Sequence, residues 1–109
     1  MTTTEKLPRV YPGKILKEEF LDEMEITPYR LAKCIGVPQS QISDIIQGKR
    51  AITPMTAIRL GLFFCNSKEF WLNLQQEYDL RRAMESLEEK GIEITCVDGS
   101  IASAGTVNH

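Results

Sequence analysis

The stretch from Thr27 to Arg50, TPYRLAKCIGVPQSQISDIIQGKR, constrains the fold more than any other part of this 109-residue chain. Thr27 can cap a helix through its hydroxyl, and Pro28 suits the first helical position, where no N–H is needed. Gly36 can end that helix in a left-handed conformation because it has no Cβ. A second helical pattern follows at once. The stretch therefore predicts a helix-turn-helix at about residues 28–47.

The second helix of this pair has an apolar face and a polar face. Ile42, Ile45 and Ile46 share the apolar face. The polar positions include Gln39, Ser40, Gln41, Ser43 and Asp44. A glutamine amide can make two hydrogen bonds to an adenine edge, and a serine hydroxyl can donate or accept. Lys49 and Arg50 follow the helix, where they can hold phosphate. This pattern predicts a helix that reads bases in the major groove of DNA.

The alternative is a generic helical hairpin whose polar face meets only water, and the distribution of charge argues against it. Residues 27–59 hold five basic side chains and one acidic side chain, a net charge of +4, whereas the whole chain carries −2. The basic side chains are Arg30, Lys33, Lys49, Arg50 and Arg59. An otherwise acidic chain with one basic surface suits localised contact with phosphate.

Composition excludes several other classes of protein. The hydrophobic content of 42% fits one globular domain, and no apolar run reaches the length of a membrane span. The N-terminal residues lack the apolar core of a signal peptide, so we expect a cytoplasmic location. Three separated cysteines and the single His109 predict no metal site and no cofactor. We expect Cys34 and Cys65 to be small buried residues.

No pattern in the chain predicts an enzyme. There is no catalytic triad, no glycine-rich phosphate loop and no metal-ligand cluster. The first predicted helix is rich in carboxylates, which fit a solvated helix face better than a catalytic set. These residues are Glu18, Glu19, Asp22, Glu23 and Glu25.

Helical patterns cover most of the remaining chain and predict an all-α fold. A first helix is expected at Lys14–Glu23, after an extended arm at residues 1–13. Its inner face would carry Ile15, Leu16 and Phe20. Thr53 and Pro54 would begin a central core helix, whose apolar residues are Ala57, Ile58, Leu60, Leu62, Phe63 and Phe64. Asn66-Ser67 would cap a long last helix at about residues 68–89. The predicted helix-turn-helix domain spans residues 14–90.

Residues 91–109 are predicted to form a C-terminal extension. Ile92–Val97 alternates apolar and polar side chains, which is typical of a strand. A lone strand needs a partner, and the candidates are its dimer mate or another chain. Asp98–His109 is small and polar, so we expect it to be flexible.

Three further motifs accompany the helix-turn-helix: PGKILKEEFL before it, GKRAITPMTAIRL after it, and EFWLNLQQEYDL at the start of the last helix. With these motifs, residues 12–83 resemble the HigA-type antitoxins of bacterial toxin–antitoxin modules, a branch of the phage-repressor-like helix-turn-helix family. The resemblance implies a five-helix DNA-binding domain, a homodimer, and repression from a palindromic operator in the chain's own promoter. It also implies a cognate small toxin, in this family usually a ribonuclease.

The resemblance assigns site residues position by position. Gln39, Ser40 and Gln41 match the base-reading start of the recognition helix, and Ser43 and Asp44 match its second turn. Phosphate contacts are implied for Thr27, Pro28, Lys49 and Arg50.

Two positions in this site depart from the family pattern. Pro38 replaces the usual Ser or Thr cap and its hydroxyl. Asp44 stands where a neutral amide is common. It accepts a hydrogen bond from a cytosine amino group, or it lies in solvent or pairs with Arg50.

Dimerisation is expected because one recognition helix reads only a few base pairs, and specific binding uses two half-sites about 34 Å apart. The predicted dimer interface consists of Tyr78, Leu80, Met84 and Leu87, which lie beyond the compact part of the domain. The alternative function is a stand-alone helix-turn-helix repressor without a toxin partner. The acidic first helix, the N-terminal arm and the 92–97 strand are all candidates for a toxin-binding surface.

Overall fold

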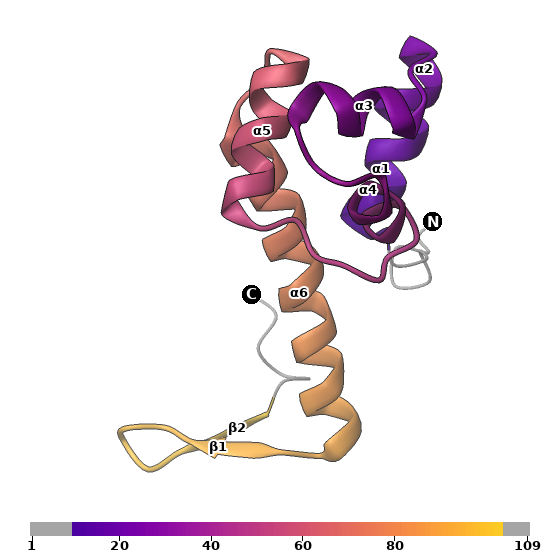
Figure 1. The fold of residues 1–109 in the computed structure, drawn as a ribbon. Helices are drawn as coiled ribbons and strands as arrows, with labels where there is room; N and C mark the ends of the chain where they lie inside the picture. Colours follow the sequence, from indigo (N-terminus) through magenta and orange to yellow (C-terminus); the bar gives the residue numbers. More distant parts are fainter. Residues whose placement is uncertain (1–9, 104–109) are drawn as a thin grey trace. The chain divides into compact units, whose positions relative to one another are not determined.

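The structure, a computed structural model, describes residues 10–103 and divides into two compact units, one ending at Tyr78 and one beginning at Asp79. Most of the predicted arm (residues 1–9) and the end of the predicted tail (residues 104–109) lie outside the described residues. The described part of the chain consists of helices and one pair of short strands (Figure 1). The predicted all-α fold is confirmed.

The first helical stretch runs through three consecutive segments: α1 (Pro12–Ile15), η2 (Leu16–Leu21) and α2 (Asp22–Met24). It begins at Pro12, two residues before the predicted start, so Pro12 and Gly13 belong to the helix and not to the arm. Both residues are buried. A Cβ on Gly13 would lie 1.7 Å from the carbonyl oxygen of Ile45, so only glycine lets this helix approach the helix that carries Ile45 so closely.

The middle segment, η2, is a π-helix, whose hydrogen bonds span five residues instead of four. The Asp22 N–H donates to the Lys17 carbonyl in this way. The wider turn brings Leu16 and Leu21 to the same side, and both are buried. Of the three residues predicted on the inner face, Leu16 is buried and Phe20 packs against the core, whereas Ile15 is only half-buried. Leu21, which was not placed on that face, is buried as well.

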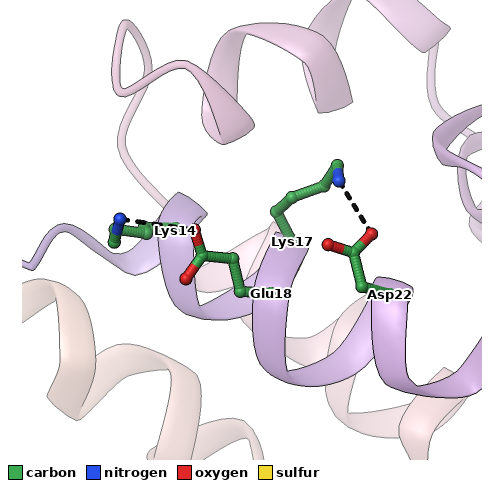
Figure 2. Close-up of polar contacts among 4 residues, drawn as sticks. All are labelled: Lys14, Lys17, Glu18 and Asp22. Atoms are coloured by element: carbon green, nitrogen blue, oxygen red, sulfur yellow. Dashed lines mark hydrogen bonds and ion pairs between the residues drawn. The ribbon is translucent and has the colours of Figure 1, made fainter.

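Two ion pairs on this helix reflect its change from α-helical to π-helical geometry (Figure 2). Lys14 and Glu18, four residues apart, meet at 3.3 Å between Nζ and Oε2. Lys17 and Asp22, five residues apart, meet at 2.7 Å between Nζ and Oδ1. Residues five apart do not face each other on an α-helix. The second pair is therefore a consequence of the π-helical turn.

The predicted helix-turn-helix is formed by α3 (Pro28–Ile35) and α4 (Gln39–Ile46), which cross at a steep angle (Figure 1). The Thr27 hydroxyl caps α3 by accepting a hydrogen bond from the Arg30 N–H at 3.1 Å. Gly36 ends α3 with a left-handed φ of 77°. These features confirm the predicted caps.

The next two helices are α5 (Pro54–Phe64) and α6 (Lys68–Lys90). Each begins at a hydroxyl cap, because the Thr53 hydroxyl accepts from the Thr56 N–H and the Ser67 hydroxyl accepts from the Phe70 N–H. The start of α6 contributes Trp71, which is fully buried and whose indole N–H donates to the Asn66 side-chain oxygen.

The core of the first unit lies between these helices. Its buried apolar residues are Leu16, Leu21, Leu31, Ala32, Ile35, Ile42, Ile45, Ile52, Ala57, Leu60 and Trp71. The helix predicted to be the central core helix, α5, contributes Ala57 and Leu60 to this core. Ile58 is 42% exposed and Leu62 is 77% exposed, so α5 buries only one side. Cys34 and Cys65, which were expected to be buried, are also exposed.

The second unit contains the end of α6 and a hairpin of β1 (Glu93–Thr95) and β2 (Ile101–Ser103). The strands are antiparallel, with Ile94 opposite Ala102. The predicted strand is therefore not a lone strand, because it pairs with a strand of the same chain. In the turn, Asp98 accepts hydrogen bonds from both the backbone N–H and the hydroxyl of Ser100, and these bonds hold the pKa of Asp98 below its usual value.

Candidate DNA-binding surface

The turn between α3 and α4 is held from outside by a basic side chain. The Arg59 guanidinium, from α5, donates to the carbonyl of Ile35 at the end of α3. A helix ends with unsatisfied carbonyls and partial negative charge, so a cation suits this position. Arg59 therefore positions the turn. Because its guanidinium is bonded within the fold, it does not belong to the basic surface predicted from the sequence.

The polar face of α4 points away from the core. Gln39 and Ser40 are exposed, and Ser43 and Asp44 are half-buried. Gln47, which sequence reasoning did not include in the site, is exposed three residues after Asp44 and so extends this face. Helical spacing was the signal that could have found it, because positions 40, 44 and 47 share one side of a helix.

Gln41 is less exposed than its neighbours Gln39 and Ser40. It is half-buried, and its Nε2 donates to the Thr56 hydroxyl on α5 at 3.3 Å. The Thr56 hydroxyl is in turn 3.2 Å from that of Thr53, the cap of α5. The Gln41 side chain is thus hydrogen-bonded within the fold, on the side of α4 that faces α5.

The loop after α4, which was predicted to contact phosphate, also packs within the fold. Lys49 and Arg50 are exposed, and the Lys49 N–H donates to the Asp44 carbonyl at 2.8 Å. Gly48 has a φ of +82°, and a Cβ there would come 3.3 Å from the Tyr11 ring. Tyr11 therefore packs against the loop that presents both cations.

Pro38 and Asp44, the two positions that depart from the family pattern, differ in what they contribute to the structure. Pro38 provides no side-chain cap, and only its carbonyl contributes, by accepting from the Gln41 N–H at 3.0 Å. Within residues 10–103, no ion pair joins Asp44 to Arg50. That alternative is removed, and contact with a base or with solvent is left for Asp44.

Two further cations lie on α3. Arg30 and Lys33 are exposed, and the Lys33 ammonium lies 5.6 Å from the centre of the Tyr29 ring. Together with Lys49 and Arg50, they leave the helix-turn-helix with a surface on which basic groups predominate. Such a surface attracts the phosphates of a duplex and is sensitive to salt.

The four residues of the predicted dimer interface have different environments. In the first unit, Tyr78 is half-buried and its ring meets the Tyr11 ring edge-on, with centroids 6.4 Å apart. In the second unit, Leu80 is 59% exposed, whereas Met84 and Leu87 are half-buried. Leu80 is therefore the most accessible member of the predicted set.

The described residues contain no cluster of potential metal ligands, and no helix among them is long and apolar enough to cross a bilayer. The short helix pair, the glycine turn, and the polar face of α4 flanked by exposed cations define a helix-turn-helix DNA-binding domain.

Comparison with known proteins agrees with this class. The helix-turn-helix family model matches residues 16–64. Antitoxin HigA-1 of Vibrio cholerae is 41% identical over 80 residues, which make up 73% of this chain and 74% of that protein. A structure of Pseudomonas aeruginosa antitoxin HigA with the higBA promoter has 40% identity and a TM-score of 0.73, covering 76% of this chain and 90% of that one.

A second Pseudomonas aeruginosa structure, of a protein in complex with its 18-base-pair operator DNA, gives the same identity of 40% and TM-score of 0.73. The match covers 76% of this chain and 87% of that one. The chain belongs to the HigA family of helix-turn-helix antitoxins.

Proposed function

We propose that this protein binds a palindromic operator in its own promoter as a homodimer, represses its own operon, and neutralises a cognate ribonuclease toxin. The observation that carries the DNA-binding part is the polar face of α4. Gln39 and Ser40 are exposed there, and the exposed cations Lys49 and Arg50 follow the same helix. Amides and hydroxyls read base edges, while cations hold phosphate.

In this proposal the contacts divide between two groups. Base reading falls to Gln39, Ser40, Ser43 and Asp44, with Gln47 as an addition. Gln41 supports the reading face through Thr56 and contacts a base only if that bond is exchanged. Phosphate contact falls to Thr27 and Pro28 at the start of α3, and to Lys49 and Arg50.

Binding as a dimer is supported by the size of the operator in a relative. The Pseudomonas aeruginosa operator complex contains 18 base pairs. One recognition helix reads only a few of these, so a second helix about one DNA turn away is needed to use the rest. We extend this arrangement to the present chain.

The toxin-binding surface is proposed to include the acidic first helix. A ribonuclease must carry basic groups to hold RNA, and carboxylates are their natural counterparts. Lys14 and Lys17 neutralise Glu18 and Asp22, while Glu19 and Glu23 are exposed and join no ion pair within residues 10–103. These two free carboxylates are the proposed contacts.

The DNA-binding part is tested by fluorescence anisotropy with a labelled duplex from the promoter region of the protein's own gene. We expect binding at least a thousandfold tighter than to a scrambled duplex of equal length and composition, the lower end for specific DNA-binding proteins. Equal affinity for the two duplexes at the same salt concentration would contradict the proposal.

The toxin part is tested by co-expressing the protein with the product of a small neighbouring gene. We expect the two to co-purify and the antitoxin to restore growth. Charge reversal with Glu19→Lys and Glu23→Lys should weaken the complex, and Glu88→Lys on α6 is the matched control. If no neighbouring product binds while the operator is bound, the protein is instead a stand-alone repressor.

A further inference from the structure

Tyr11, the residue just before α1, lies against the loop that follows α4. Its ring atoms Cδ2, Cε2 and Cζ lie 3.4, 3.3 and 3.5 Å from the point that a Cβ on Gly48 would occupy. Gly48 has no Cβ, so the ring takes the space beside the loop that a larger residue would fill. One edge of the Tyr11 ring, including the atom that carries the hydroxyl, therefore lies along this loop.

The Tyr11 hydroxyl has no partner in the part of the chain that the structure describes. It makes no capping hydrogen bond to α1, although Tyr11 is the residue at the cap position. The side chain is half-buried, and its contact with another side chain is the ring of Tyr78. A phenol can donate one hydrogen bond and accept others. This donor is therefore open to a group outside the protein.

Two cations come directly after Gly48. Lys49 and Arg50 are exposed, and neither joins an ion pair within residues 10–103. The backbone on both sides of them is held, because the Lys49 N–H donates to a carbonyl of α4 and the Ile52 N–H donates to α6. A neutral donor thus lies on a fixed loop beside two positive charges. This combination suits a phosphate, which accepts several hydrogen bonds and carries negative charge.

The Tyr11 ring is itself held in place. It meets the Tyr78 ring edge-on, with centroids 6.4 Å apart, and the Tyr11 carbonyl accepts from the Lys14 N–H at 3.0 Å. An edge-to-face aromatic pair is stabilising, and a tyrosine has only two side-chain torsions to fix. The fold therefore presents the hydroxyl at a small cost in conformational entropy.

We propose that the Tyr11 hydroxyl donates a hydrogen bond to a backbone phosphate of bound DNA, beside the phosphates held by Lys49 and Arg50. Tyrosine hydroxyls are among the groups that contact DNA phosphates. This inference rests on the proposed DNA-binding function and adds a contact to it. The phosphate contacts predicted from the sequence were Thr27, Pro28, Lys49 and Arg50.

The test compares Tyr11→Phe, which removes only the hydroxyl, with Tyr11→Leu, which removes the ring as well. Fluorescence anisotropy measures binding to the promoter duplex and to a scrambled duplex. Tyr11→Phe should weaken binding to both by about tenfold, the effect of one hydrogen bond to a charged group, because a phosphate contact carries no sequence information. Its circular dichroism and melting temperature should match those of the unmodified protein. Tyr11→Leu should also melt at a lower temperature.

The dependence on salt separates the hydroxyl from the cations. A neutral hydroxyl releases no counterion, so Tyr11→Phe should leave the slope of log affinity against log salt concentration unchanged. Lys49→Ala should lower that slope by about one unit. If Tyr11→Phe binds both duplexes as tightly as the unmodified protein, the inference is overturned. Weaker binding by Tyr11→Leu alone would mean that the ring only positions the loop.

A second measurement identifies the phosphate. Promoter duplexes with single methylphosphonate linkages, each of which removes the charge of one phosphate, are titrated with the unmodified protein and with Tyr11→Phe. At one linkage or more, the change should cost the variant less than it costs the unmodified protein, because the same hydrogen bond cannot be lost twice. Equal costs at every linkage would overturn the inference.

The two proposals fail in different ways. If the unmodified protein binds neither duplex, the proposed DNA-binding function is wrong and the Tyr11 contact with it. If the unmodified protein binds the promoter duplex and Tyr11→Phe binds it equally well, only the Tyr11 contact is wrong.

Discussion

The side-chain oxygen of Gln75 accepts a hydrogen bond from the backbone N–H of Ile52 at 2.8 Å. Gln75 lies in α6 and is only 9% exposed, and Ile52 lies in the loop between the recognition helix and α5. The bond ties the loop that presents Lys49 and Arg50 to a helix 23 residues further along the chain. Gln75 therefore acts on the DNA-binding surface without being part of it.

Replacing Gln75 tests this anchoring. Gln75→Met keeps the volume but leaves the Ile52 N–H buried without its acceptor, at a cost of about 1–3 kcal/mol in the free energy of unfolding. Chemical denaturation measures the loss, and hydrogen exchange at the Ile52 amide should accelerate. Gln76→Met, at the exposed neighbouring position, is the control and should change stability little. Equal effects of the two substitutions would show that the anchor is unimportant.

Substitution of Gln39 and of Gln41 should differ in its effects on DNA binding and on stability. Gln39→Ala should cost about 1–3 kcal/mol of binding to the operator and leave weak binding to random DNA nearly unchanged, because an exposed amide reads bases. Gln41→Ala should also lower the free energy of unfolding, by about 0.5–1.5 kcal/mol, because it loses the bond to Thr56. Anisotropy titrations and denaturation curves give the two quantities. Equal loss on operator and random DNA for Gln39→Ala would argue against base reading.

Lys49 should contribute to binding regardless of sequence. Lys49→Ala should weaken binding to operator and random duplexes alike, and lower the slope of log affinity against log salt concentration by about one unit. Titrations at several salt concentrations measure that slope. Lys68→Ala is the control, because Lys68 is paired with Glu69 and lies outside the helix-turn-helix. An unchanged slope for Lys49→Ala would remove it from the phosphate contacts.

Gly13 should tolerate no side chain. Gly13→Ala would place a Cβ 1.7 Å from the Ile45 carbonyl oxygen and force the first helix away from α4. We expect a loss of about 3 kcal/mol in the free energy of unfolding, at the upper end for overpacking of a well-packed core. Lys14→Ala, at the exposed next position, should change it far less. A melting temperature unchanged by Gly13→Ala would contradict the close approach.

Local signals in the sequence predicted most of the helices. Thr27, Thr53 and Ser67 were read as caps, and each accepts a hydrogen bond from the N–H three residues later. Caps act over one helical turn, so they can be read without knowledge of the fold. The exposed polar residues of the recognition helix, Gln39 and Ser40, followed from the same periodicity.

The features that the sequence did not predict depend mostly on contacts between helices. Gln41 looks like its neighbours in the sequence, and only the position of Thr56 on α5 shows where its amide is held. Ile58 and Leu62 belong to a helix that is apolar on most sides, so hydrophobicity alone does not say which side meets the core. The β-hairpin does carry a local signal in the sequence, because Asp98-Gly99 is a turn pair and Gly99 has a φ of +93°.

The π-helical turn in the first helix has a consequence for how this segment can vary. An α-helix needs one residue fewer to bring Leu16 and Leu21 to the same side. Deleting one residue from 18 to 20 would therefore turn this segment into an ordinary α-helical turn. The two leucines would then be four residues apart and still face the core, and Lys17 and Asp22 would also be four apart and still able to meet. The segment can thus lose one residue while its buried leucines keep their places, and homologous helices that are one residue shorter here should be α-helical throughout.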